Sequence, residues 1–236
     1  MAEVEQPHRS GAFGQLVYSA VFLLLFGAIF ILIGGDVRWV EGWIFAAAFT
    51  VFSVATVFRM YLKDPELLHE RMGPPFQKGQ SFWDKLMIVL IVVTYVAWYV
   101  ILPLDAVRYN WSPAFPLWLK VLGFFICIFG FWMFYETFRE NTFAAPVVKI
   151  QHDRKQHVIS TGLYGIVRHP LYLGGITYVL GGTLLIGSLY GLVSTATFAV
   201  VLAIRTLIEE STLSRDLEGY KEYMEKVRWR LIPLIF

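Results

Sequence analysis

The residues best suited to chemistry are concentrated in one polar segment of the last third of the chain. Residues 139–175 read RENTFAAPVVKIQHDRKQHVISTGLYGIVRHPLYLGG. Valine, isoleucine and glycine follow one another in extended and turn-prone order over residues 150–167, which predicts a structured loop rather than a helix. Arg168 and His169 come next, and Pro170 is suited to the first position of a helix. The two basic side chains therefore stand where the chain enters an apolar helix, either as interfacial anchors or as part of a binding site.

Small and aromatic residues follow within the first turn of that helix. Tyr172, Gly174 and Gly175 leave room for the close approach of a ligand or of a neighbouring helix. Helix packing is the more common role of such glycines, so both interpretations stay open at this point.

A second group of ionisable residues ends the next apolar run. Arg205, Glu209 and Glu210 lie there, and ionisable residues at membrane depth usually face the protein interior or an aqueous cavity. Arg205 and Glu209 are four residues apart, so they share a helix face and are able to pair. We expect Arg205 to face a pocket, paired with Glu209 or with a polar acceptor. For Glu210 a second interpretation is that its carboxylate is simply solvated where the helix leaves the membrane.

The composition requires that these residues be positioned by membrane helices. Of the 236 residues 57% are hydrophobic and 16% are charged, and the mean hydropathy is +0.57. Typical soluble domains have about 45–50% apolar and about 25% charged residues. This excludes a disordered chain, a nucleic-acid binder and an ordinary cytosolic globule. Cys127 is the only cysteine, which excludes an internal disulfide framework and a CxxC metal site.

Stretches without Asp, Glu, Lys or Arg give the number of spans. Four of them, at residues 10–35, 42–58, 86–104 and 121–135, predict one helix each, whereas residues 170–204 are too long for one crossing. Gly187, Ser188 and neighbouring glycines offer a break, so we expect helices at 171–187 and 190–208 joined by a tight turn. The prediction is an all-α integral membrane protein with about six transmembrane helices, the last two forming a helical hairpin. The tail from about residue 209 is expected to form an amphipathic helix up to Arg228.

The basic residues predict the orientation. With six spans, all but three of the 20 Lys and Arg residues fall on one side of the membrane, and the three are Arg38, Arg108 and Lys120. Positive charge stays cytoplasmic, so we expect both termini and the C-terminal region in the cytoplasm. The short loops fit a bacterial inner membrane, which is the localisation we expect. Residues 1–138 would form the N-terminal transmembrane region, and residues 139–236 the C-terminal functional region.

The C-terminal third resembles a known family. TGLYGIVRHPLYLGG, an apolar hairpin and EESTLSRDLEGYKEYMEKVRWRLIP together resemble the isoprenylcysteine carboxyl methyltransferase family and the related membrane phospholipid and thiol methyltransferases. The resemblance covers about residues 139–236. It implies an integral-membrane enzyme that uses S-adenosylmethionine and acts on a lipophilic small molecule or lipid. Many relatives have proline after the loop glycine where this chain has Leu163, and no prenyl-peptide site is identifiable, so the acceptor can be a carboxylate, a thiol or an amine.

By the same resemblance, the cofactor site falls on ten residues. They are Thr161, Gly162, Tyr164, Arg168, His169, Pro170, Tyr172, Gly174, Glu209 and Glu210. Arg168, His169 or loop N–H groups would take the cofactor carboxylate, and Glu209 or Glu210 the ammonium or ribose. Tyr164 and Tyr172 would lie against the adenine or the sulfonium. The expected catalytic residues are Arg205 and Glu209.

Two other functions remain as alternatives. An intramembrane NADPH-dependent reductase of the sterol-reductase type would have a similar C-terminal arrangement. A non-enzymatic small transporter subunit would have polar residues in several spans, but the first three spans are nearly free of ionisable groups. No soluble-type nucleotide motif is found. No histidine pair has metal-site spacing with a cysteine or carboxylate pattern, so no metal and no nucleic-acid partner are expected.

Overall fold

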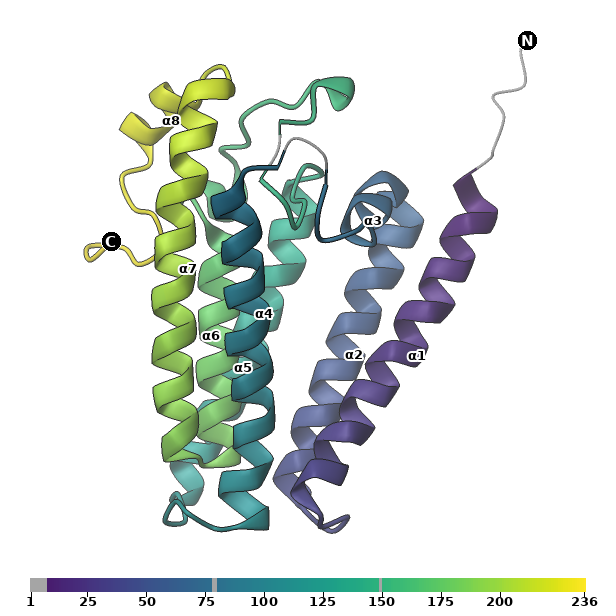
Figure 1. Ribbon diagram of the computed structural model, residues 1–236, viewed down its shortest axis with the longest axis vertical. Helices are drawn as coiled ribbons and strands as arrows, with labels where there is room; N and C mark the ends of the chain where they lie inside the picture. Colours follow the sequence, from purple (N-terminus) through teal and green to yellow (C-terminus); the bar gives the residue numbers. More distant parts are fainter. Residues whose placement is uncertain (1–7, 78–79, 149) are drawn as a thin grey trace.

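The described part of the chain is helical and contains no strand. The computed structural model describes residues 8–77, 80–148 and 150–236 (Figure 1). The α-helices are α1 (His8–Gly34), α2 (Val40–Lys63), α3 (Pro65–Arg71), α4 (Phe82–Pro103), α5 (Leu117–Glu140), α6 (Pro170–Ile186), α7 (Leu189–Asp216) and α8 (Tyr220–Lys226). A π-helical turn (Leu104–Arg108) extends α4, and two 3-10 turns (His152–Arg154 and Gly162–Gly165) interrupt the loop between α5 and α6.

The long helices run up and down in alternation. Figure 1 shows α3, α8 and the loop between α5 and α6 at one end of the bundle. The α1–α2 turn, the α4–α5 connection and the α6–α7 turn lie at the other end. The polar loop and the end of α7, which are far apart in the sequence, therefore meet at the same end.

Five helical segments are long and apolar enough to cross a membrane among the described residues. They are Gly14–Gly34, Val40–Lys63, Phe82–Arg108, Leu117–Glu140 and Leu189–Asp216. The apolar helix α6 has 17 residues, which is at the lower limit of about 17–25 residues for a crossing. A sixth crossing by α6, and with it the membrane hairpin and the cytoplasmic position of the C-terminal region, remain predictions.

Local sequence explains where the helices begin and end. The Ser81 hydroxyl caps α4 by accepting a hydrogen bond from the Asp84 N–H at 3.1 Å, and Asp64 caps α3 in the same way ahead of Pro65. Gly187 ends α6 with a φ of 85°, a left-handed conformation that favours glycine. Ser188 then caps α7. The break between the two helices therefore lies within the predicted turn.

The tail does not form the single helix expected from residue 209 to Arg228. The helix α7 continues to Asp216, and the short helix α8 starts only at Tyr220. Between them, Gly219 has a φ of 79°, which breaks the helical path. Tyr220, Tyr223 and Val227 are buried in a small cluster of their own, so the tail packs against the protein.

The core is an aromatic cluster between the helices, and α5 and α6 approach each other most closely. A Cβ added at Gly130 would lie 2.5 Å from the backbone nitrogen of Tyr178, so only glycine permits this spacing. At the end opposite the polar loop, the buried carboxylate of Asp105 accepts hydrogen bonds from the hydroxyls of Ser112 and Ser188. This contact joins the α4–α5 connection to the α6–α7 turn.

Candidate active site

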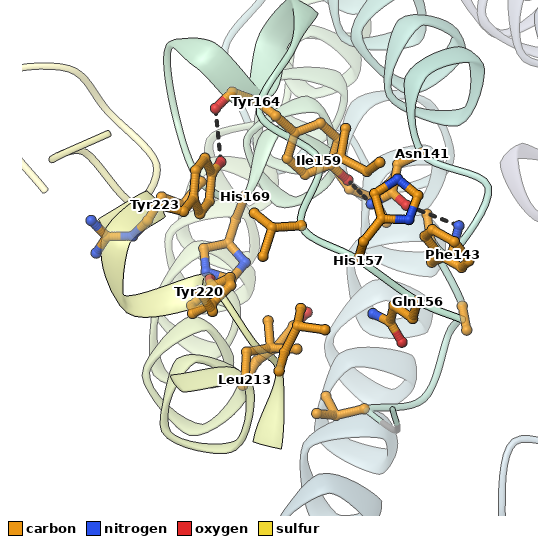
Figure 2. A pocket seen from close by; sticks show the side chains of 18 of the residues that line it. Asn141, Phe143, Gln156, His157, Ile159, Tyr164, His169, Leu213, Tyr220 and Tyr223 are labelled. Atoms are coloured by element: carbon orange, nitrogen blue, oxygen red, sulfur yellow. Dashed lines mark hydrogen bonds between the residues drawn. The ribbon is translucent and has the colours of Figure 1, made fainter. Parts of the chain in front are cut away.

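A cavity of about 100 Å³ lies among the polar loop, the start of α6, the end of α7 and α8. In Figure 2, His157 and Gln156 line one side, and His169, Tyr220 and Leu213 line the other. The remaining wall residues are Asn141, Phe143, Ala144, Ala145, Val147, Val148, Val158, Ile159, Tyr164, Arg168, Leu171, Tyr172, Glu209, Leu217 and Tyr223. The cavity thus combines one carboxylate, several aromatic rings and an apolar lining.

Glu209 stands at the end of a chain of polar contacts that reaches away from the cavity. Its carboxylate accepts a hydrogen bond from the Tyr172 hydroxyl at 2.5 Å. That hydroxyl accepts one from Nε of Arg205 at 2.8 Å, and Nη2 of Arg205 lies 3.1 Å from Oδ1 of Asp84. The expected direct pairing of Arg205 with Glu209 is therefore replaced by a pairing with Asp84, and Tyr172 links Arg205 to Glu209. Arg205 itself is not part of the cavity wall.

The same ion pair fixes one wall of the cavity. Nη2 of Arg205 donates to the Pro146 carbonyl at 2.7 Å, and the N–H of Val148 donates to Oδ2 of Asp84 at 3.2 Å. Because Asp84 and Arg205 are both buried, each charge needs the other. The pair holds the wall segment 143–148 between α4 and α7.

Glu210 is buried, and its carboxylate contacts two arginines and one histidine. Its Oε1 lies 2.6 Å from Nε of Arg168 and 3.2 Å from Nε2 of His169, and its Oε2 lies 2.8 Å from Nε of Arg230. Arg168 also donates from Nη1 to the carbonyls of Val227 and Arg228. Glu210 is therefore not solvated, and together with Arg168 it ties the tail to α6 and α7.

The aromatic walls are held in place from several sides. The His169 and Tyr172 rings are parallel within 3°, with centroids 5.5 Å apart. The Tyr164 hydroxyl accepts a hydrogen bond from the Asn141 amide at 2.8 Å, and the Tyr223 hydroxyl donates to the Tyr164 carbonyl at 2.7 Å (Figure 2). Burial raises the pKa of the Tyr164 and Tyr223 phenols well above their usual value. Both phenols are therefore neutral at physiological pH.

Five of the predicted cofactor residues lie outside this wall, and Glu210 with its buried ion pairs is one of them. The Thr161 hydroxyl donates to Glu140 at 2.6 Å, and Gly162, with a φ of 57°, also packs against Glu140. Pro170 forms the first turn of α6, and Gly174 faces Met133 of α5. The structure thus brings Tyr164, Arg168, His169, Tyr172 and Glu209 to the cavity, and it places the others in supporting positions.

Comparison with known proteins adds one family. The model of the phospholipid methyltransferase family matches residues 118–218. This segment is therefore similar to the phospholipid methyltransferase family. None of the curated proteins matches the chain. With its five membrane-length apolar helices, the protein is an integral membrane protein, and its residues 118–218 resemble a family of membrane methyltransferases.

The family segment holds every predicted site residue but not the whole cavity. It runs from α5 to the end of α7, whereas Tyr220 and Tyr223 of α8 follow it. Asp84 of α4, which contacts the wall residue Val148 but does not line the cavity, precedes it. The sequence interpretation missed these three residues, and also Asn141 and His157. The resemblance to methyltransferases included the tail motif around Tyr220 and Tyr223, which was the available signal for those two. Nothing local in the sequence marks Asp84, because its partner Arg205 is distant along the chain.

Among the described residues, no group of three or more His, Cys, Asp or Glu side chains is arranged to hold a metal ion. The polar side chains at the cavity contact one another and the backbone.

Proposed function

We propose that the protein is an S-adenosylmethionine-dependent methyltransferase that acts on a lipophilic acceptor arriving from the bilayer. The observation that carries the proposal is the Glu209 carboxylate at the wall of an aromatic cavity, inside the family segment. Within residues 8–77, 80–148 and 150–236, no Lys, Arg or His forms an ion pair with Glu209. An anionic side chain in this position favours a cationic ligand.

The residues present fit the chemical groups of this cofactor. Glu209 would hold the ammonium or the ribose hydroxyls, and the rings of Tyr164, Tyr172 and Tyr220 would pack against the adenine or the sulfonium. His169 and Gln156 supply polar atoms for the carboxylate. Arg168 is already engaged by Glu210 and two backbone carbonyls, so we assign it to holding the wall rather than the ligand.

The cofactor supplies an electrophilic methyl group on its sulfonium sulfur. The protein's part is to orient and to exclude water, because a displacement gains mainly from alignment and from a dry pocket. Tyr172 is held between Arg205 and Glu209, which fixes the ring and the carboxylate together. We therefore assign Arg205 as a positioning residue and Glu209 as a cofactor-binding residue. The acceptor atom can be a carboxylate oxygen, a thiol sulfur or an amine nitrogen.

The topology forms part of the proposal. We propose six crossings with both termini and the cavity on the cytoplasmic side of the membrane, because the basic residues cluster at the cavity end. Residues 1–138 would then anchor the protein in the membrane and contact the acceptor, and residues 139–236 would bind the cofactor.

Two neighbouring carboxylates provide the test. In isothermal titration calorimetry on the detergent-solubilised protein, Glu209→Gln should weaken S-adenosylmethionine binding about ten- to a hundredfold, the usual effect of losing a charged hydrogen bond. Its melting temperature should stay close to that of the wild type. The matched variant Glu210→Gln should instead lower the melting temperature, since it leaves Arg168 and Arg230 without their buried partner.

The titration also separates the alternative functions. Wild-type protein that binds NADPH but not S-adenosylmethionine would be a reductase, and protein that binds neither would contradict an enzyme of either kind. Equal S-adenosylmethionine affinity in the wild type and in Glu209→Gln would show that Glu209 does not bind the cofactor.

A further inference from the structure

A second, more apolar pocket lies between α2 and the group α4 to α7. Its volume is about 330 Å³. Most of its wall is aromatic or aliphatic, and Gly175 of α6 and Arg71 at the end of α3 also belong to it. The other residues are Phe49, Ser53, Thr56, Val57, Met60, Tyr95, Phe131, Phe134, Phe138, Tyr178, Val179 and Phe198. Apart from Arg71 and the residues of α6, all of its wall residues belong to membrane-length helical segments, so the pocket is suited to an apolar chain.

Arg71 is the only charged side chain in this wall. Its guanidinium lies 4.3 Å from the centroid of the Phe138 ring, and its Nη1 donates to the Ala144 carbonyl at 2.9 Å. Ala144 lines the first cavity, so Arg71 stands at the border between the two pockets.

The charge of Arg71 has no acidic partner in the part of the chain that the structure describes: one carbonyl and one ring are its contacts there. Burial lowers the pKa of its guanidinium to about 10, which leaves it charged at neutral pH. Buried charges in proteins are usually paired. Arg205, at the same end of the bundle, is paired with Asp84. Among the described residues Arg59 also has no acidic partner, but it lines neither pocket, so the half-buried Arg71 is the unpaired charge that stands at a pocket.

We propose that the second pocket holds the apolar tail of the methyl acceptor and that Arg71 binds an anionic group on its head. This inference rests on the proposed function, because it names the acceptor as an amphiphile with one anionic group, such as a phosphate or a carboxylate. A guanidinium binds either group through two parallel hydrogen bonds. The apolar wall takes the chain, and Arg71 stops the head at the border of the cofactor cavity. Arg71 is thus a specificity-determining residue for the charge of the acceptor.

Binding of dodecyl phosphate tests the inference without any turnover. The protein is placed in nanodiscs of zwitterionic lipid, and binding is followed by microscale thermophoresis. Arg71→Gln should weaken the binding about ten- to a hundredfold, whereas Arg71→Lys, which keeps the charge but loses the planar fork, should weaken it less. The matched control is Arg59→Gln. Arg59 packs over Tyr135 at 5.6 Å and lines neither pocket, so its loss should leave the affinity unchanged.

The apolar part of the site has its own pair of variants. A Cβ at Gly175 would meet only ordinary contacts, the nearest at 3.7 Å, so Gly175→Ala should bind as the wild type does. Gly175→Leu should fill the pocket and abolish binding of dodecyl phosphate. Inorganic phosphate should not compete at millimolar concentration, and dodecanol should bind more weakly than dodecyl phosphate.

Three results would overturn the inference: equal affinity of wild type and Arg71→Gln, equal binding of dodecanol and dodecyl phosphate, or displacement by inorganic phosphate alone. S-adenosylmethionine titrations on the same samples keep the two proposals apart. Arg71→Gln should retain cofactor affinity. A variant that loses dodecyl phosphate binding but keeps S-adenosylmethionine binding reports on the second pocket alone. A wild-type protein that does not bind S-adenosylmethionine contradicts the proposed function instead.

Discussion

At the scale of single residues, Tyr172 is the contact through which Arg205 reaches the cavity. Its ring is stacked on His169 and its hydroxyl stands between Arg205 and Glu209. Removing the hydroxyl would therefore break the link between the Arg205–Asp84 ion pair and Glu209, while the Tyr172 ring stays in place. Arg205 would act on turnover by holding that hydroxyl.

We expect Arg205→Ala to lower kcat at saturating cofactor more than it raises KM for the cofactor, by about ten- to a hundredfold in kcat. Tyr172→Phe should show the same split with a smaller change in melting temperature, because Asp84 keeps its partner. Steady-state kinetics on both variants measure this. A purely structural role for Arg205 predicts a lower melting temperature and an unchanged kcat per folded molecule.

The buried phenols of the cavity predict a loss of stability in alkali. The pKa of Tyr164 and of Tyr223 is raised by burial, while the unfolded chain releases its phenolic protons near pH 10. Above that pH the unfolded state holds fewer protons than the folded state, so the free energy of unfolding falls as pH rises. Thermal melts between pH 8 and 11 should show the decrease beginning near pH 10. Replacing Tyr223 by Phe should reduce the slope, and a slope unaffected by this variant would contradict the assignment.

Residue types and spacing could predict part of this site. Arg168, His169, Tyr172 and Glu209 were marked by their place at membrane boundaries, and Tyr164 by the family resemblance. All five line the cavity. Asp84 and Arg71 could not be found in this way. Each looks like an ordinary charge near a helix end, and only the packing of α3 and α4 beside the loop shows that they are buried or enclosed.

At the scale of elements, the close approach of α5 and α6 positions the start of α6 at the cavity. A Cβ at Gly181 would lie 2.2 Å from the backbone nitrogen of Cys127, and backbone cannot move aside as a side chain does. We expect Gly181→Ala to destabilise the protein by about 1–3 kcal/mol, measured by thermal unfolding in detergent. Gly175→Ala in the same helix is the control and should be neutral. Equal stability of both variants would mean that the helices are able to separate without cost.

Helix positions were more predictable than helix ends. Apolar runs located α1, α2, α4, α5 and α7 because burial in lipid requires long uncharged stretches. The tail was misjudged because its charged and apolar residues fit a continuous helix, whereas a single residue, Gly219, turns the chain. The preceding Leu217 then contributes to the cavity wall.

At the scale of the whole molecule, the crossing by α6 is the point that an experiment has to decide. Cys127 is buried and is the only cysteine, so single exposed cysteines can be introduced with little background. The positions are Leu117, Leu189 and Lys221. Six crossings predict that Leu117→Cys and Leu189→Cys react with an impermeant maleimide from outside the cell, and that Lys221→Cys reacts only after lysis. Reaction of Lys221→Cys from outside, with Leu189→Cys protected, would mean that α6 does not cross.

The ties between Glu210, Arg168 and Arg230 have a consequence for biosynthesis. The cavity draws its wall from the loop after α5, from α7 and from α8, and the tie that holds the tail in place needs Arg230. A nascent chain that has inserted all its long helices but has not yet released residue 230 from the ribosome has no complete cavity. Any ligand of the cavity therefore selects molecules whose synthesis has passed residue 230, and it can rescue a weakened variant only after this point.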